Sequence, residues 1–231
     1  MKIKKINRFM LACLTATFAL FSLGALNGCK KVDLGLTPFV SELRQNIYEG
    51  EKDGLRVKAT YGYRESPYLA DGKIEKSEYR LTFTLPEILP EDATYTLSFK
   101  YNDTDYKTDF KLNVAKNVLY ASVPIENFNA QEFSVTVIKA TTITTLNLVS
   151  TIPQGTLSFR GALDTLQNKQ PSLIKEYTDQ NGQFCAEIYQ RIIVKDGKAY
   201  WYIGLTDKSG GIKALLIDGK TGELLAVREV F

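Results

Sequence analysis

The amino-acid sequence predicts a mainly β protein, in which an N-terminal antiparallel β-sandwich is followed by a small α+β domain. Between residues 55 and 150, apolar residues recur at every second position in short runs separated by turn residues. After residue 155 the apolar spacing becomes helical and then returns to alternation. With 231 residues, 44% of them apolar and 24% charged, the chain is long enough for one large or two small packed domains.

The N-terminus combines a basic head with a long apolar run. The head is "MKIKKINR", and the run "FMLACLTATFALFSLGAL" covers residues 9–26 without a charge. This combination is typical of an export signal. The run is also just long enough to span a membrane, so an uncleaved transmembrane anchor is the alternative.

The run ends in "LNGC", residues 26–29, which resembles the lipobox of bacterial lipoproteins. It departs from the family at Asn27, where a small residue such as Ala or Ser is preferred. The resemblance implies a signal peptide over 1–28, cleavage between Gly28 and Cys29, and a diacylglyceryl group, with fatty acids such as palmitate, on the Cys29 thiol. Two acyl chains, at about 0.8 kcal/mol per buried methylene, anchor a protein firmly to a membrane. The lipoprotein would then lie on the extracytoplasmic side.

Residues 29–38 are predicted to be a lipidated tether. The segment "KKVDLGLTP" spans at most about 30 Å when extended, so the folded part is expected close to the bilayer. Of the three cysteines, Cys13 would leave with the signal peptide and Cys29 would be acylated. Cys185 then remains alone, so we expect no intramolecular disulfide and an inert, partly covered thiol.

Residues 39–150 are predicted to form the sandwich. The segment 39–51, "FVSELRQNIYEGE", fits both a helical face and a strand, and we favour a strand that leads into the next one. The number and spacing of the following strands resemble an immunoglobulin-like sandwich, although the paired cysteines and core tryptophan of antibody domains are absent. Seven short strands are expected, at "LRVKATYG", "EYRLTFTLP", "TYTLSFKY", "DFKLNV", "VLYASVPI", "EFSVTVI" and "TITTLNLV".

Residues 155–231 follow the boundary segment "STIPQG" and begin with helical spacing that Pro171 interrupts. Two strands then flank Asp196-Gly197, a dipeptide favoured in two-residue hairpin turns. This turn places Ile192 opposite Trp201 on an apolar face. The other face carries Tyr189, Arg191, Tyr200 and Tyr202. A second hairpin is expected to turn at residues 218–222.

A helix followed by an antiparallel meander that ends in "IDGKTGELL" resembles the PepSY domain of exported bacterial proteins and protease propeptides. The likeness covers residues 155–231. PepSY domains carry no catalytic residues, so the resemblance implies inhibition, chaperoning or localisation, and no cofactor.

Composition excludes several classes of function. The formal charge is +3, but Lys2, Lys4, Lys5 and Arg8 supply four positive charges within the first 28 residues, which hold no acid. The remainder carries −1, so no nucleic acid is expected as a partner. The chain has no histidine, which removes Ser-His and Cys-His nucleophiles and imidazole metal ligands.

Three motifs resemble catalytic or metal-binding patterns but lack required residues or have a simpler structural interpretation. Ser172 to Lys175 matches S-x-x-K, and residues 220–222 match K-T-G, but no S-D-N lies between them. Asp103, Asp105 and Asp109 are spaced like a calcium loop that lacks its glycine and distal glutamate, so a hairpin loop at "NDTD" is the simpler interpretation. The acidic segment 86–92 contains two prolines and is expected to be a connection. We therefore predict no catalytic residues and no metal site.

The sequence thus predicts a lipid-anchored, extracytoplasmic binding or inhibitory module that is not an enzyme. Its candidate binding surface consists of Tyr189, Arg191, Tyr200 and Tyr202, which would contact an envelope protein or peptide. The alternatives are an envelope enzyme that uses carboxylates or tyrosine, and a structural envelope component. Whether the envelope has one membrane or two is left open.

Overall fold

The computed structural model describes residues 35–66, 74, 76–85, 94–207 and 210–230. From Gly35 onward the chain forms one compact unit. The expected cleavage and lipidation at Gly28 and Cys29 lie outside the described residues, as does the acidic segment 86–92.

The described chain is mainly β, with thirteen strands joined in one sheet. A 3-10 turn, Thr37–Phe39, precedes the first strand. Two helices follow the ninth strand, α2 (Phe159–Lys169) and α3 (Pro171–Glu176). The strands are β1 (Val40–Lys52), β2 (Leu55–Glu65), β3 (Ser77–Leu85), β4 (Tyr95–Tyr101), β5 (Thr104–Asp109), β6 (Lys111–Asn113), β7 (Val118–Pro124), β8 (Glu132–Lys139), β9 (Thr142–Ser150), β10 (Glu187–Lys195), β11 (Lys198–Thr206), β12 (Ile212–Asp218) and β13 (Leu224–Val230).

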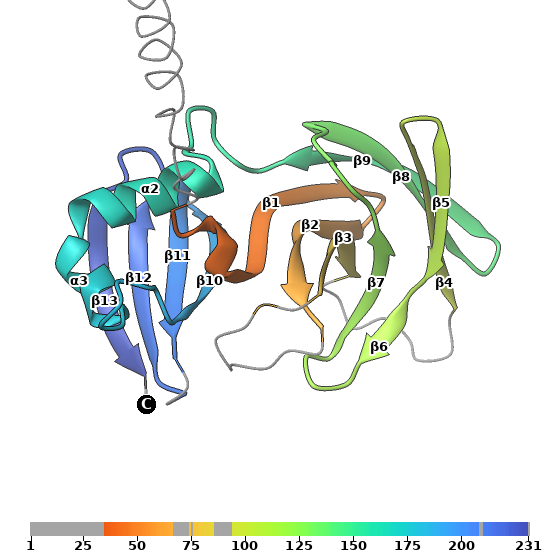
Figure 1. Ribbon diagram of the computed structural model, residues 1–231. Helices are drawn as coiled ribbons and strands as arrows, with labels where there is room; N and C mark the ends of the chain where they lie inside the picture. The colour runs from red at the N-terminus through yellow and green to blue at the C-terminus, as the bar shows by residue number, and fades with distance from the viewer. Residues whose placement is uncertain (1–34, 67–73, 75, 86–93, 208–209, 231) are drawn as a thin grey trace, which may run out of the picture. The chain divides into compact units, whose positions relative to one another are not determined.

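Strand β1 divides the sheet, because two different strands pair with one of its edges. From Glu42 to Lys52, β1 pairs with β2 in antiparallel fashion. On the other edge, its first part pairs in parallel with β10, from Val40 to Arg44. Further along, Tyr48 and Glu49 pair with the end of β9. The sheet therefore forks at residues 45–47, between β10 and β9 (Figure 1).

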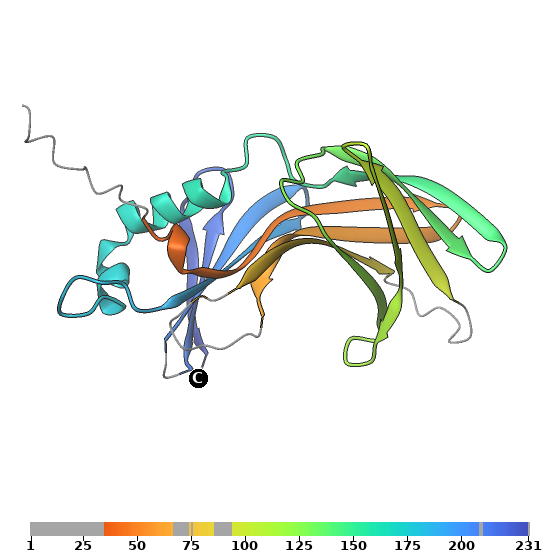
Figure 2. The ribbon, with the colours of Figure 1, turned by 45° about the vertical axis from the view of Figure 1, so that its right-hand side comes forward.

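Beyond the fork, the antiparallel strands curl back on themselves. The pairings run from β1 through β9, β8 and β4 to β5, and in the other direction through β2, β3 and β7 to β6. Only Phe110 separates β5 from β6, so the two ends of the curled sheet meet in one chain segment (Figure 2). The mainly β, antiparallel prediction is confirmed. The immunoglobulin-like sandwich is not confirmed, because the strands belong to one connected sheet.

The curled sheet contains a hydrophobic cluster rich in aromatic rings. Alternation along β3 buries Leu81, Phe83 and Leu85 as predicted. The Tyr48 ring packs edge-on against two phenylalanine rings, and its hydroxyl donates to the Ala130 carbonyl oxygen at 2.9 Å. Burial of Tyr48 and Tyr61 is tolerated because both hydroxyl groups have hydrogen-bond partners, whereas the buried Tyr95 hydroxyl has none among the described residues.

A second hydrophobic cluster includes residues of both helices, of β10–β12 and of the start of β1. Ser158 caps α2 by accepting a hydrogen bond from the Gly161 amide at 3.1 Å, and Pro171 occupies the first turn of α3. Trp201 is 1% exposed in this cluster, and its Nε1 donates to the Leu157 carbonyl oxygen at 3.0 Å. Leu36 is also buried here, so the chain is already packed before the end of the predicted tether.

The predicted register of the hairpin around Asp196-Gly197 is confirmed. Ile192 pairs with Trp201, and both turn residues have positive φ, as a two-residue turn requires. The second hairpin also turns within residues 218–222 as expected. Because β10 pairs with β1, the segments 39–150 and 155–231 share one sheet, and their division into two domains stays a prediction.

Two details of the strand prediction are wrong. Strand β5 was not expected, and it begins directly after Asn102 and Asp103, the two residues of the turn with positive φ. In "DFKLNV" the predicted apolar face is absent, because Leu112 and Val114 are 47% and 82% exposed. The reason is a change of partner at Phe110. Before Phe110 the chain pairs with β4, and after Phe110 it pairs with β7. The alternating apolar residues of this segment therefore do not lie on one face of the sheet.

Candidate binding site

The four residues of the predicted binding surface lie on the face of β10 and β11 opposite Trp201, as the register requires. Tyr200 and Tyr202 are half-buried, whereas Tyr189 is 7% exposed. The Tyr189 ring and the Tyr202 hydroxyl cover Gly204, each 3.3 Å from the place that a Cβ would occupy. Tyr189 therefore offers little area to a partner, and the binding role of the surface stays a prediction.

Arg191 connects this surface to the centre of the sheet. Its guanidinium donates twice to the Glu42 carboxylate, from Nε at 2.7 Å and from Nη2 at 2.8 Å. Glu42 lies on β1, and 16% of its side chain is exposed. Such a two-pronged pair orients both groups and is stronger than a single contact.

Strand pairing continues the line of Arg191 across the sheet. Successive partners in the register are Tyr202, Arg191, Arg44, Gly62 and Arg80, on β11, β10, β1, β2 and β3. We call these five residues the arginine row. No side chain fits at Gly62, because a Cβ there would lie 1.9 Å from the Leu43 carbonyl oxygen. The Leu43 carbonyl oxygen therefore occupies the space at Gly62, between Arg44 and Arg80 of the row.

A groove of about 640 Å³ follows the arginine row over β1–β3. Its polar wall includes the hydroxyl groups of Thr60 and Thr82, and Glu42 and Glu78 from the neighbouring register positions. Glu78 pairs with Arg80, whose Nε also donates to the Ser122 hydroxyl. We call this cavity the arginine groove.

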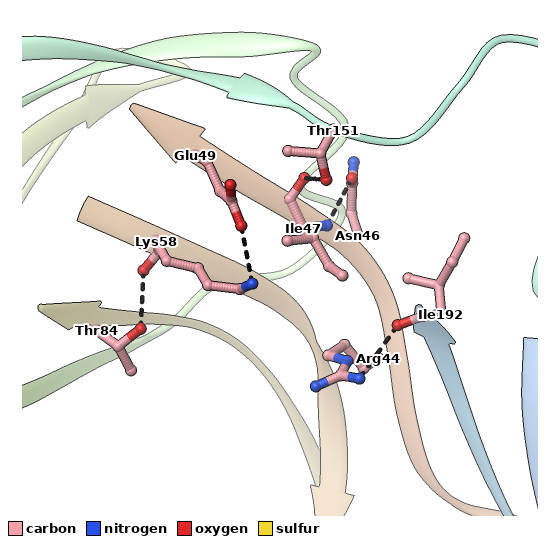
Figure 3. Close-up of polar contacts among 8 residues, drawn as sticks. All are labelled: Arg44, Asn46, Ile47, Glu49, Lys58, Thr84, Thr151 and Ile192. Atoms are coloured by element: carbon pink, nitrogen blue, oxygen red, sulfur yellow. Dashed lines mark hydrogen bonds and ion pairs between the residues drawn. The ribbon is translucent and has the colours of Figure 1, made fainter. Parts of the chain in front are cut away.

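Arg44 has a different environment from the other arginines. Its Nη2 donates to the Ile192 carbonyl oxygen at 3.2 Å, and its Nε is buried without a partner (Figure 3). Burial lowers the pKa of Arg44, the nearby charge of Arg191 lowers it further, and Glu42 acts in the opposite direction. Arg44 is therefore a partly buried cation without a carboxylate in direct contact among the described residues.

A second cavity, of about 700 Å³, lies at the fork of the sheet, and we call it the fork cleft. Its wall joins both hydrophobic clusters, because it includes Tyr61 and Phe128 from one and Trp201 from the other. None of its lining residues is an Asp, Glu, Lys, Arg or Cys. The lining residues are Gln45, Asn46, Tyr61, Phe128, Asn129, Gln131, Ser150, Ile152, Pro153, Gln154, Gly155, Thr156, Leu157, Ser158, Phe159, Ile192 and Trp201.

Asn46 lies at the fork, where neither β10 nor β9 pairs with this edge of β1. Its Oδ1 accepts hydrogen bonds from the Ile47 amide and the Ser150 hydroxyl, both at 2.8 Å, and its Nδ2 donates to Tyr48 Oη at 2.7 Å. Thr151 donates to the Ile47 carbonyl oxygen from its amide at 2.9 Å and from its hydroxyl at 3.3 Å, and Figure 3 shows the hydroxyl contact. Side chains and the chain after β9 thus satisfy the backbone groups that a neighbouring strand would otherwise bond.

The motifs rejected from the sequence have structural places of their own. Ser172 and Lys175 lie in the short helix α3, and Lys220 lies in the turn after β12, where its amide donates to Asp218 Oδ1. Within the described residues, no group of three or more Asp, Glu or Cys side chains could hold a metal ion. The Cys185 side chain is exposed, and its Sγ lies 3.3 Å from the Gln183 carbonyl oxygen. A partly covered thiol was expected, so that detail is wrong.

Sequence reasoning missed Arg44 and Asn46. The available signal was the run "ELRQN" at 42–46, five residues with one apolar side chain inside a segment that otherwise reads as a half-buried strand. Such a break in alternation indicates an irregular strand, and the register of β1 indeed shifts between Arg44 and Asn46.

Comparison of the chain with protein-family models, with curated proteins and with solved structures found no match. Among the described residues, no helix is long and apolar enough to cross a membrane.

Proposed function

We propose that the mature protein is a lipid-anchored, extracytoplasmic binding module without catalytic activity, which holds an uncharged, hydrogen-bonding ligand in the fork cleft. The observation that supports this proposal is the composition of the cleft wall. General acid–base catalysis most often uses a carboxylate, amine or imidazole within reach of the substrate, and the wall has none. Tyr61 is the ionisable group there, and burial raises its pKa, so it stays neutral.

The cleft offers amide groups to a ligand. The side-chain amides of Gln45, Gln131 and Gln154 have no hydrogen-bond partner in the described part of the chain, and each such amide can both donate and accept. A peptide strand is a poor occupant, because the Ile47 amide and carbonyl groups at the fork are already bonded. The neighbouring hydroxyl groups of a sugar match the paired donors and acceptors of the glutamine side-chain amides. We therefore propose a neutral oligosaccharide as the ligand class.

Trp201 provides the test, because it is the single tryptophan of the chain and lies in the cleft wall. Titration of the full-length protein in detergent with neutral gluco- and chito-oligosaccharides should change its fluorescence. Replacing both Gln45 and Gln131 with alanine should weaken binding about tenfold or more, since two hydrogen bonds are lost. Gln183→Ala, in a turn outside the cleft, is the matched control. Hydrolysis of the sugars, or no response to any neutral sugar, would contradict the proposal.

The anchor on Cys29 and the extracytoplasmic location belong to the same proposal, supported by the lipobox resemblance. A PepSY-like character of residues 155–231 is likewise proposed. It is supported by the order of elements, in which α2 and α3 precede the antiparallel neighbours β10–β13. A cleft with neutral walls fits an inhibitory or localising role better than it fits a hydrolytic role.

A further inference from the structure

A further cavity, of about 200 Å³, lies at one end of the curled sheet, and we call it the mouth pocket. The turn between β1 and β2 and the adjoining ends of β3, β4, β8 and β9 line it. Tyr95 belongs to the hydrophobic cluster of the curled sheet and pairs with Lys139. Val137 belongs to the same cluster and pairs with Thr144. Directly opposite side chains of antiparallel strands share a face, so Lys139 and Thr144 also face inward.

The inner wall of the mouth pocket is apolar and almost completely buried. Leu85, Tyr95 and Val137 are 1%, 2% and 2% exposed, and half-buried Leu55 completes this wall. A cavity of about 150 Å³ with apolar walls holds one benzene molecule. The mouth pocket therefore has room for one ring or one branched aliphatic chain with a small polar group, but not for a peptide.

Two hydrogen-bond donors in the pocket have no acceptor in the described part of the chain. Lys139 Nζ lies over the Tyr95 ring, 5.4 Å from its centroid, and has no carboxylate partner. The Tyr95 hydroxyl is buried and has no hydrogen-bond partner. A buried hydroxyl without a partner costs free energy, so its presence calls for an explanation. An acceptor with a negative charge would satisfy both groups.

Asp53 provides the opposite charge at the rim of the pocket. It is exposed in the tight turn with Gly54, where both residues have positive φ. Its carboxylate has no ion-pair partner among the described residues, whereas Arg56, the other cation of the wall, is bound to Glu51. The wall therefore offers one unpaired cation and one unpaired anion, and this arrangement favours a ligand that carries both charges.

We propose that the mouth pocket binds a free apolar α-amino acid, such as leucine. The carboxylate of the amino acid pairs with Lys139 and accepts a hydrogen bond from the Tyr95 hydroxyl, its ammonium group pairs with Asp53, and its side chain packs against the apolar wall. A zwitterion leaves the charges of the pocket balanced, whereas a fatty acid would leave Asp53 unpaired and add a negative charge. The mouth pocket shares no lining residue with the fork cleft, so the two sites are separate.

The test uses full-length protein with 15N-labelled glycine in lipid nanodiscs, because detergent chains would compete for an apolar pocket. The amide signal of Gly54, which lines the pocket, is followed by NMR during titration with leucine, glycine, leucinamide and N-acetyl-leucine. Glycine lacks the apolar chain, leucinamide lacks the carboxylate, and N-acetyl-leucine lacks the ammonium group. We expect leucine to bind about tenfold or more tightly than each control, and Gly155 in the fork cleft not to respond. Equal binding of leucine and any control would overturn the proposal.

Two charge variants separate the contacts of the amino acid. Lys139→Met should weaken leucine binding about tenfold and leave leucinamide binding unchanged, since only leucine presents a carboxylate. Lys111→Met is the matched control, because Lys111 is exposed on β6 outside the pocket. Asp53→Asn keeps a turn sequence that favours positive φ, and it should weaken the binding of leucine but not of N-acetyl-leucine.

Tyr95→Phe separates binding from folding. Removal of a buried hydroxyl without a partner should not lower the melting temperature, whereas leucine binding should weaken several-fold because a donor is lost. An unchanged dissociation constant for leucine in any of the three pocket variants, or a Gly54 signal that leucine does not shift, would overturn the proposal. Neutral sugars, read out by Trp201, test the fork cleft separately.

Discussion

Replacing Asn46 with alanine is expected to open the fork of the sheet and to destabilise the protein by about 2–4 kcal/mol. The magnitude follows from three hydrogen bonds of 2.7–2.8 Å, which join the Asn46 amide to Ile47, Ser150 and Tyr48. Each such bond contributes about 0.5–1.5 kcal/mol net, and the loss is larger where a buried partner stays unsatisfied. The Ile47 amide is such a partner, because Ile47 is 5% exposed and its amide donates to Asn46 Oδ1, whereas the Tyr48 hydroxyl keeps its bond to the Ala130 carbonyl oxygen.

Urea unfolding of the full-length protein in detergent, followed by Trp201 fluorescence, measures this loss. A change of 3 kcal/mol should also lower the melting temperature by about 6–12 °C for a domain of this size. Asn113→Ala is the control, because its Oδ1 accepts one hydrogen bond from Lys116 in an exposed turn, and it should cost about 1 kcal/mol or less. Equal losses for the two variants would refute the reasoning that the Asn46 network holds the fork.

Three further predictions follow from individual side chains. Trp201→Ala should cost about 3–5 kcal/mol in urea unfolding and Tyr202→Ala clearly less, because Trp201 is 1% exposed and Tyr202 is half-buried; equal costs would contradict the packing. Cys29→Ser should abolish fatty-acid labelling and leave an unprocessed precursor, and retained labelling would favour an uncleaved transmembrane anchor instead. The Thr221 and Lys220 amides hold the pKa of Asp218 below its usual value, so its contribution to stability is present above about pH 3.9 and is lost as the pH falls through the lowered pKa. Asp218→Asn should therefore flatten the fall in melting temperature between pH 5 and pH 2, and an unchanged profile would argue against this role.

The elements that the sequence predicted correctly are those in which local pattern and burial agree. The 79–85 and 95–101 strands alternate strictly, and their apolar residues are buried on one face. The 184–206 hairpin was predicted to the residue, because Asp196-Gly197 sets the turn and a slip of one position would expose Trp201. The ambiguous segment 39–51 is also a strand, as favoured.

The candidate site was only partly within reach of the sequence. Tyr189, Arg191, Tyr200 and Tyr202 do share a face, since the hairpin register determines it. No local pattern predicts that Arg44 lies next to Arg191, because 147 positions separate them and the parallel pairing of β1 with β10 brings them together. Nor could it show that Glu42 already binds Arg191, or that Tyr189 is largely covered.

The amino-acid sequence by itself determined most of the strands, with β5 as an exception, and the turn and apolar face of the hairpin around Asp196-Gly197. These properties depend on neighbours two to four residues apart, through side-chain alternation and turn conformation. The tertiary structure decided that β1 pairs with β10 and β9 on one edge and that the curled sheet closes through Phe110. It also decided that three arginines from β10, β1 and β3 lie in one row. Strand pairing between distant segments depends on the packing of the whole core and on backbone hydrogen bonds that every residue type can make, so no local pattern specifies it.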